Sequence, residues 1–365
     1  MKKRLAALVA VLAIVAAACG GGAANNDEST TTTQAPDATP PAQTEAGGLL
    51  ATVQERGKLQ CGVGGTAVAF SETQPDGSMT GFDADFCRAV AAAVLGDANA
   101  VEFRTLTSKE RFEALKNKEI DVLIRNTTWT QSRDTDIGMD FGPTTYYDGQ
   151  QLMGLSSKFT VNSGAKDVDG AILCTNAGTT TEKNITEWAK IGGADIQLET
   201  VEVFPEAIEK FKAGTCDLVT TDGSGLVGQK ASNAEGVDWV IFPAAPISKE
   251  PLGPVYRQND SQWGDVINWT VFAMIIADEY GITSANIDDK PVADLAPELG
   301  RLFGGDGELQ TAMGLNADAF YQVIKQVGNY DEVYSNNLNP VGLVREGSLN
   351  ARFTEGGMIY APPAR

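Results

Sequence analysis

The chain has 365 residues, a formal net charge of −20 and no histidine, and its sequence pI is near 4.4. This acidity argues against nucleic-acid binding and against a basic patch for anionic lipid, but one buried arginine can still bind an anion. The absence of histidine removes the commonest general base and metal ligand, so we expect neither a metal nor a cofactor.

Residues 1–18 have the pattern of an export signal. Lys2, Lys3 and Arg4 precede an apolar run that is too short for an ordinary membrane span. The run ends in Ala-Ala-Ala-Cys and resembles a bacterial lipoprotein signal, which makes Cys19 the expected lipid-attachment residue. The alternative is an ordinary cleaved signal with an incidental cysteine. Residues 19–48 are rich in Gly, Ala, Thr and Pro, and we expect a disordered tether there.

From residue 49 the chain alternates helical and extended patterns, which predicts an α/β fold. Asp83 is the expected N-cap of a helix that ends at Leu95. Thr107 and Glu110 have the spacing of a capping box for the next helix. In this first half, helices are predicted at 49–56, 83–95 and 107–116, and strands at 58–63, 101–106 and 120–124.

The apolar run at 120–124 predicts a buried parallel strand, and polar residues follow it directly. Asn126, Thr128 and Arg133 would then lie in the crevice beyond the carboxyl end of the strand, where ligands bind in open α/β sheets. An arginine there can bind a carboxylate through two nitrogens. On local pattern alone, Arg133 could equally be a solvated loop residue paired with Asp134 or Asp136.

A second stretch repeats this pattern. Asp217 lies 96 residues beyond Asp121, and the same offset carries Asn126 onto Asp222. The repeat predicts two similar α/β lobes whose strand ends face each other, with a cation on one and an anion on the other. A ligand with a carboxylate and an ammonium group would fit between them. The alternative role for Asp222 is a helix N-cap.

The expected division is lobe 1 at 49–145 and 246–365, and lobe 2 at 146–245, joined by crossings at 143–151 and 243–246. Thr179 and Glu182 form another expected capping box, and the free amides at that helix start attract anions. Residues 282–307 and the C-terminal tail give no clear element. In this half, strands are predicted at 152–155, 171–175, 196–201, 217–221, 237–242 and 252–257, and helices at 179–191, 205–213, 261–280 and 317–327.

After Cys19 four cysteines remain, an even number that favours disulfides in an exported protein. Two fall in each lobe, so Cys61–Cys87 with Cys174–Cys216 is the simplest of the three possible pairings. The alternative is four free buried thiols.

Several stretches together resemble the periplasmic solute-binding proteins of polar-amino-acid ABC transporters, of the general L-amino-acid branch. The resemblance covers nearly all of the chain from residue 62 onward. The stretches are G-F-D-A-D-F-C-R-A-V-A-A-A-V, L-T-S-K-E-R-F-E-A-L, R-N-T-T-W-T-Q-S-R-D, A-G-T-T-T-E, C-D-L-V-T-T-D, S-K-E-P-L-G-P and I-K-Q-V-G-N-Y.

The resemblance implies a type II periplasmic-binding-protein fold, with the ligand in the cleft between the lobes. It assigns the α-carboxylate of the ligand to Arg133 and the α-ammonium to Asp222. Where the family often has a second aromatic residue, this chain has Ser108 and Arg111, which leaves the side-chain pocket open to polar or acidic ligands. Further contacts implied are Asn126 (main chain), Thr128, Gly178, Thr179 and an aromatic wall at Phe70.

The expected function is capture of free L-amino acids outside the cytoplasm by hinge closure, and delivery to a membrane permease and ATPase. A monomer is expected. The first alternative is a dehydratase-like enzyme on the same fold. The sequence offers no histidine and no obvious spare carboxylate for such catalysis, with Glu110 and Glu182 left open as candidates. The second is a ligand-binding partner of a membrane sensor.

Overall fold

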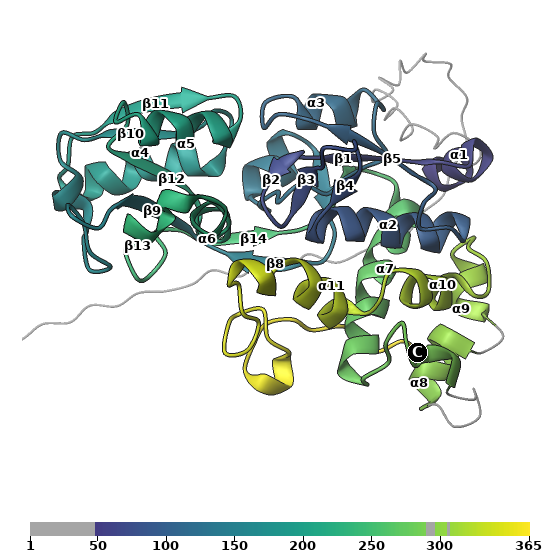
Figure 1. Ribbon diagram of the computed structural model, residues 1–365. Helices are drawn as coiled ribbons and strands as arrows, with labels where there is room; N and C mark the ends of the chain where they lie inside the picture. The colour runs from purple at the N-terminus through teal and green to yellow at the C-terminus, as the bar shows by residue number, and fades with distance from the viewer. Residues whose placement is uncertain (1–47, 290–295, 305–306) are drawn as a thin grey trace, which may run out of the picture. The chain divides into compact units, whose positions relative to one another are not determined.

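The computed structural model describes residues 48–289, 296–304 and 307–365 (Figure 1). The predicted export signal, the lipid site at Cys19 and the tether up to residue 47 lie outside the described residues. In the described part, no helix combines the length and the apolar character needed to cross a membrane.

The first lobe is built on a five-stranded sheet in the order β5-β1-β6-β15-β7. Strands β5 and β6 run parallel to β1, whereas β15 is antiparallel to both β6 and β7. The expected parallel strand after residue 119 is therefore present, although β6 is shorter than predicted. The strands are β1 (Leu59–Val63), β5 (Val101–Thr105), β6 (Val122–Leu123), β7 (Met139–Phe141) and β15 (Val255–Arg257).

The second lobe repeats this arrangement in the order β11-β10-β12-β9-β13. Strands β11 and β12 run parallel to β10, and β9 is antiparallel to β12 and β13. Strands β6 and β12 thus hold equivalent central positions, which confirms the repeat inferred from the sequence offset. The strands are β9 (Gln150–Leu155), β10 (Ile172–Asn176), β11 (Gln197–Val201), β12 (Leu218–Asp222) and β13 (Trp239–Phe242).

Two antiparallel strands connect the lobes. Strand β8 (Tyr146–Asp148) pairs with β14 (Glu250–Leu252), and Glu250 lies opposite Asp148. The first crossing is where the sequence placed it. The predicted return crossing at 243–246 is wrong, because the prolines there end β13 and the chain crosses a few residues later. Gly253 and Pro254 then separate β14 from β15.

Helices cover the sheets, and the long helix α7 buries Trp263, Val266 and Met274 completely. It packs against α2, α10 and α11. The helices are α1 (Gly48–Arg56), α2 (Phe82–Leu95), α3 (Arg111–Lys116), α4 (Thr180–Gly192), α5 (Phe204–Lys212), α6 (Gly223–Ser232), α7 (Ser261–Glu279), α8 (Pro297–Leu299), α9 (Glu308–Ala312), α10 (Ala319–Gln326) and α11 (Tyr330–Asn337).

Smaller elements complete the described chain. A three-stranded sheet follows β1, and short helical turns lie in several connections, including described parts of 282–307, where no element was predicted. They are β2 (Thr66–Ala67), β3 (Ser71–Thr73), β4 (Met79–Thr80), η1 (Ser132–Asp136), η2 (Ala165–Val168), η3 (Ala234–Asp238), η4 (Ile287–Asp289), η6 (Gly300–Gly304), η7 (Asn339–Val341) and η8 (Phe353–Glu355).

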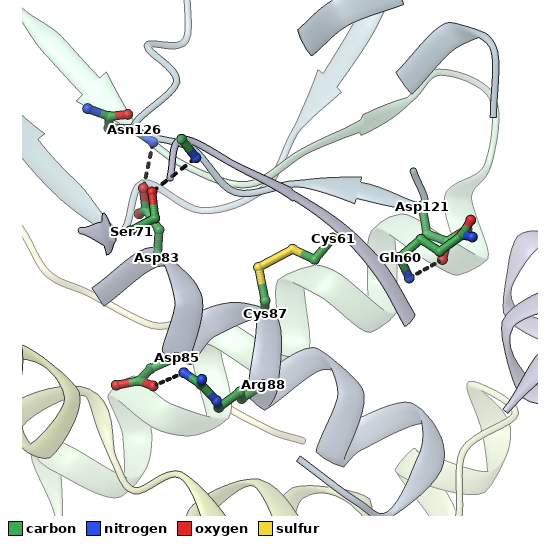
Figure 2. Close-up of a disulfide and its surroundings, with 10 residues drawn as sticks. Gln60, Cys61, Ser71, Asp83, Asp85, Cys87, Arg88, Asp121 and Asn126 are labelled. Atoms are coloured by element: carbon green, nitrogen blue, oxygen red, sulfur yellow. Dashed lines mark hydrogen bonds and ion pairs between the residues drawn. A yellow bond between two sulfur atoms is a disulfide. The ribbon is translucent and has the colours of Figure 1, made fainter. Parts of the chain in front are cut away.

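Both disulfides form with the pairing favoured by the sequence. Cys61 of β1 is bonded to Cys87 of α2, which ties a central strand to the helix that covers it (Figure 2). Cys174 of β10 is bonded to Cys216, just before β12. The alternative of free thiols is wrong for these four residues.

The prediction that Asp83 caps α2 is wrong. Gly81 holds the N-cap position, with a φ of 122°. The backbone of Gly81 lies so close to that of Phe70 that a Cβ on Gly81 would be 2.3 Å from the Phe70 carbonyl oxygen. Only glycine fits that approach. Asp83 instead lies inside the first turn, and its buried carboxylate accepts a hydrogen bond from the neighbouring loop at Asn126.

Candidate functional site

A cavity lies between the carboxyl ends of the central strands of the two lobes. It encloses about 80 Å³, whereas one water molecule needs roughly 10–15 Å³ by the same measure. The first lobe contributes Gly64, Thr66, Ala67, Val68, Phe70, Ser108, Arg111, Arg125, Asn126 and Thr128, and the second contributes Asn176, Thr179, Thr180, Thr181, Val203, Phe204, Thr221, Asp222, Gly225 and Gln229.

Most residues that the sequence predicted for a binding site line this cavity. Arg133 and Gly178 are the exceptions. The predicted residues that line it are Phe70, Ser108, Arg111, Asn126, Thr128, Thr179 and Asp222.

Arg133 lies directly behind the cavity wall. Its Nη1 donates to the carbonyl of Thr128 at 2.8 Å, and its guanidinium lies over the ring of Phe112 at 5.4 Å. Burial lowers the pKa of Arg133, while the carboxylates of Glu250 and Asp222 oppose that shift. The alternative of a solvated loop arginine is therefore wrong, since Arg133 is only 6% exposed.

Two further arginines bring positive charge to the cavity wall. Arg111 is buried. Its Nη1 lies 3.3 Å from the hydroxyl of Thr127, and its Nε has no hydrogen-bond partner within the described chain. Burial lowers the pKa of Arg111 well below its usual value, and the nearby Arg133 and Arg125 add to this. An unpartnered buried N–H group is costly, so Arg111 is suited to receive an anion.

Arg125 was not identified from the sequence, although it follows β6 within the predicted anion-binding stretch. Its Nε donates to the carbonyl of Leu106 at 2.9 Å. Burial lowers its pKa to about 10, and the carboxylates of Asp83 and Asp222 counteract this. Arg111, Arg125 and Arg133 together form what we call the arginine cluster of the first lobe.

Asp222 provides the opposite charge on the second lobe. It occupies the N-cap position of α6, but its side chain makes no capping hydrogen bond, so the expected alternative role is not fulfilled. Burial raises the pKa of Asp222 well above its ordinary value; Asp148 and Glu250 add to the shift, and Arg133 and Arg111 oppose it. The raised pKa favours the protonated form of the Asp222 side chain, and a cation that enters the cavity would favour the carboxylate.

Asp148 is a second acid that the sequence did not single out, although it lies in the predicted crossing. Its Oδ1 accepts the amides of Gly149 at 2.8 Å and Ser224 at 3.3 Å, whereas its buried Oδ2 has no partner among the described residues. Burial raises the pKa of Asp148 to about 6. The carboxylate of Asp148 also raises the pKa of Asp222, as expected for like charges that lie close together, and Glu250 raises the pKa of both.

Two backbone amides expected to face the ligand carboxylate already have partners. The amide of Asn126 donates to Asp83 Oδ2 at 2.7 Å, with Asn126 at a φ of 29° (Figure 2). The amide of Gly178 donates to Glu182 Oε2 at 2.7 Å, and the hydroxyl of Thr179 caps α4 by accepting the amide of Glu182 at 3.0 Å. Half of the predicted capping box is therefore present, because Glu182 accepts the amide of the residue before the N-cap and not the N-cap amide itself. Asn126 and Thr179 still contribute to the cavity wall, but Gly178 does not.

The aromatic residues have mostly packing roles. Phe70 lines the cavity and packs edge-on against Phe82 and Tyr146, with ring centroids 5.8 and 5.4 Å apart. Tyr146 is buried in the core, and Trp129, which is 45% exposed, stacks on Phe141.

Comparison with known proteins agrees with this architecture. Residues 59–284 match the family described as bacterial extracellular solute-binding proteins, family 3. The chain is 43% identical to the glutamate/glutamine/aspartate/asparagine-binding protein BztA of Rhodobacter capsulatus, over 87% of this chain and 93% of that one. It is 42% identical to the general L-amino acid-binding periplasmic protein AapJ of Rhizobium johnstonii, over 87% and 92%.

Solved structures show the same fold. A periplasmic binding protein of an ABC transporter from Brucella ovis, with glutathione bound, is 42% identical and has a TM-score of 0.81, over 87% of this chain and 99% of that one. An arginine-binding protein from T. maritima, at 22% identity and a TM-score of 0.56, shares the fold over 64% and 96%. The fold is that of type II periplasmic binding proteins, and the chain belongs to family 3 of the bacterial extracellular solute-binding proteins.

Proposed function

We propose that this chain captures a free L-amino acid in the cavity between its lobes and delivers it to an ABC importer. The observation that carries the proposal is the division of charge, with the arginine cluster on the first lobe and Asp222 on the second. An amino-acid zwitterion has a carboxylate for one side and an ammonium group for the other. The relatives named as amino-acid-binding proteins support the same ligand class.

Closure of the lobes is the proposed mechanism of capture. The lobes already touch at the rim of the cavity, where Lys109 Nζ and Glu202 Oε1 are 2.5 Å apart, and at Gly228, whose Cα faces Val68. A ligand that contacts both lobes stabilises the closed arrangement by its differential affinity for it. The permease and ATPase would recognise that arrangement.

The side chain of the ligand is proposed to be acidic or an amide. Arg111 lines the cavity with an unpartnered Nε, and Ser108 lies beside it on the same wall. A side-chain carboxylate or amide oxygen would complete the hydrogen bonding of Arg111. The four amino acids in the name of BztA are acidic or amide amino acids, which supports this class of ligand.

A γ-glutamyl peptide is a second candidate. The γ-glutamyl end of such a peptide has a free α-carboxylate and α-ammonium group, which the same clamp could hold. A shallower hollow lined by Gly65, Thr105 and Thr107 adjoins the cavity through Gly64, Thr66 and Val203, and it offers room for the remainder of the peptide. The glutathione-bound relative supports this candidate.

We also propose that the chain is not an enzyme. Both carboxylates considered as catalytic groups are engaged in helix caps: Glu110 Oε2 accepts the hydroxyl of Thr107 at 2.8 Å, and Glu182 accepts the amide of Gly178. Neither lines the cavity between the lobes, although Glu110 lines the adjoining hollow. Chromatographic recovery of the ligand unchanged after long incubation supports the proposal, and recovery of a dehydrated product contradicts it.

We also propose where the chain is located and what it contacts. The chain would be a lipoprotein attached through Cys19, with a tether at 19–48 and a monomeric binding domain on the outer face of the cytoplasmic membrane. Its partner would be a permease rather than a sensor. Incorporation of a labelled fatty acid that is lost in Cys19→Ala tests the anchor. Co-purification of crosslinked membrane proteins tests the partner.

A thermal-shift screen of the common L-amino acids and glutathione tests the proposed function. A ligand at a hundredfold excess over its dissociation constant stabilises the folded chain by about 2.7 kcal/mol. We expect the largest shifts with L-glutamate, L-glutamine, L-aspartate or L-asparagine. A screen in which no amino acid and no γ-glutamyl peptide raises the melting temperature contradicts the function.

A further inference from the structure

The S-K-E-P-L-G-P stretch contains a buried acid that the binding site does not use. Glu250 lies on the crossing strand β14, is 1% exposed and is not part of the cavity wall. A buried carboxylate needs several hydrogen bonds to offset its loss of solvation. The groups that donate hydrogen bonds to Glu250 therefore indicate which segments of the chain it connects.

The four donors to Glu250 come from three separate segments. Oε2 accepts the hydroxyl of Thr128 at 2.6 Å, from the first lobe, and that of Thr180 at 2.9 Å, from the second. Oε1 accepts Asn184 Nδ2 at 2.7 Å, also from the second lobe, and the hydroxyl of Ser248 at 2.6 Å, from its own segment. One carboxylate thus joins the loop after β6 to the first turn of α4.

Thr128 connects this carboxylate to the arginine cluster. Its hydroxyl donates to Glu250, while its carbonyl accepts Arg133 Nη1. Separation of the lobes must break the contact of Glu250 either with Thr128 or with Thr180 and Asn184. Closure makes both at once, in a site from which water is excluded and where charge-assisted hydrogen bonds are strong.

We propose that Glu250 is a positioning residue that holds the lobes closed around the ligand without touching it. This inference rests on the proposed function, because it assigns the closed arrangement to ligand capture. Glu250 and the ligand stabilise the same arrangement, so they are thermodynamically coupled. Loss of the Glu250 contacts is expected to accelerate ligand release more than it slows ligand entry.

The test measures association and dissociation rates of L-glutamate on the full-length chain by stopped-flow fluorescence. Glu250→Gln keeps the shape but replaces one acceptor oxygen with a donor that faces Asn184 and Ser248. We expect dissociation to become roughly 10–100-fold faster. Glu202→Gln is the matched control, because it removes a carboxylate that joins the lobes at the exposed rim, where the expected effect is below about fivefold.

A reversed pair separates this role from general damage to the fold. Asn184→Asp places a second carboxylate against Glu250, and ligand dissociation from this variant should be faster than from the parent. In the double variant Glu250→Gln/Asn184→Asp, the new glutamine amide can donate to the new aspartate, which restores the contact with donor and acceptor exchanged. Ligand dissociation should therefore slow again to a rate close to that of the parent. In Glu250→Gln, thermal stability should fall more with ligand bound than without it.

Three results would overturn the inference: unchanged dissociation in Glu250→Gln, no recovery in the double variant, or an equal loss of stability with and without ligand. Ligand binding by the parent chain tests the proposed function separately from this inference. If L-glutamate does not bind the parent, the rates are measured with the tightest ligand of the thermal-shift screen. If that screen finds no ligand, the proposed function and this inference fail together.

Discussion

The carboxylate of Asp83 accepts the backbone amide of Asn126 at 2.7 Å, so a buried acid on α2 fixes the turn that follows the central strand of the first lobe. Figure 2 shows the two residues facing each other above the Cys61–Cys87 disulfide. Burial raises the pKa of Asp83 from its ordinary 3.8 to about 7, against the lowering effects of Asn126 and Arg125. The cavity wall therefore depends on a group that titrates near neutral pH.

This raised pKa predicts a pH dependence of stability. Between pH 4 and pH 7 the folded state keeps a proton on Asp83 that the unfolded state has lost. The stabilisation from that proton is complete below about pH 4 and is lost as the pH rises toward 7. Asn at this position can still accept the Asn126 amide. The free energy of unfolding of Asp83→Asn, from urea denaturation, should therefore rise relative to that of the parent from pH 4 to pH 7. A constant difference contradicts the assignment.

Proton release on ligand binding is expected at the acidic side of the cavity. The pKa of Asp148 is raised to about 6 and that of Asp222 is raised well above 3.8, so the empty cavity keeps protons that an arriving ammonium group displaces. Affinity should fall as the pH is lowered through 6. Calorimetry in buffers of different ionisation enthalpy should show net proton release near pH 6, reduced in Asp148→Asn. A binding enthalpy independent of the buffer would rule out this coupling.

In the proposed function, the arginine cluster acts on two parts of the ligand. We propose that Arg133, from behind the cavity wall, attracts the α-carboxylate, which every amino acid has, whereas Arg111 contacts the side chain. Arg133→Gln should therefore weaken L-glutamate and L-glutamine alike, by about 3–5 kcal/mol if the charge is buried with its partner. Arg111→Gln should weaken L-glutamate more than L-glutamine. Calorimetry with both ligands decides, and equal losses for both ligands in Arg111→Gln would contradict the division.

Gly228 allows the second lobe to approach the first. A Cβ at this position would lie 3.1 Å from the Cβ of Val68, so a larger side chain holds the lobes apart. Gly228→Val should cost about 1–3 kcal/mol of binding free energy, the usual range for overpacking. It should leave the stability of the ligand-free chain unchanged or higher, since glycine is a poor helix residue. Adding Val68→Ala should restore affinity, and failure to do so argues against the steric cause.

The sequence predicted the layout of this protein better than the details of its site. The polar residues after β6 could be matched with those after β12, because the two strands hold equivalent positions in the two sheets. The ends of these two strands face the same cavity, so the residues that follow them were predicted to contact one ligand. The cap that Thr179 makes on α4 was predictable because its residues are close in sequence. The return crossing was misplaced because prolines mark both turns and edge strands.

What the sequence missed depends on burial and on long-range contacts. Nothing in the local pattern around Asp148 shows that its neighbour in space is Asp222, or that one oxygen is left unpartnered. Glu250 likewise contacts residues that are 122 and 70 positions away along the chain. Asp83 matched a capping pattern, but the close approach of Gly81 to Phe70 moved the helix start and turned its carboxylate toward Asn126.

The central claim is that a zwitterion lies between the arginine cluster and Asp222. The most direct measurement is a calorimetric cycle with L-glutamate and glutarate, which lacks the amino group, on the parent chain and on Asp222→Asn. We expect the parent to bind L-glutamate far more tightly than glutarate, and Asp222→Asn to lose about 3–5 kcal/mol for L-glutamate with little or no loss for glutarate. Equal losses for both ligands, or no loss for L-glutamate, would show that Asp222 does not hold the ammonium group.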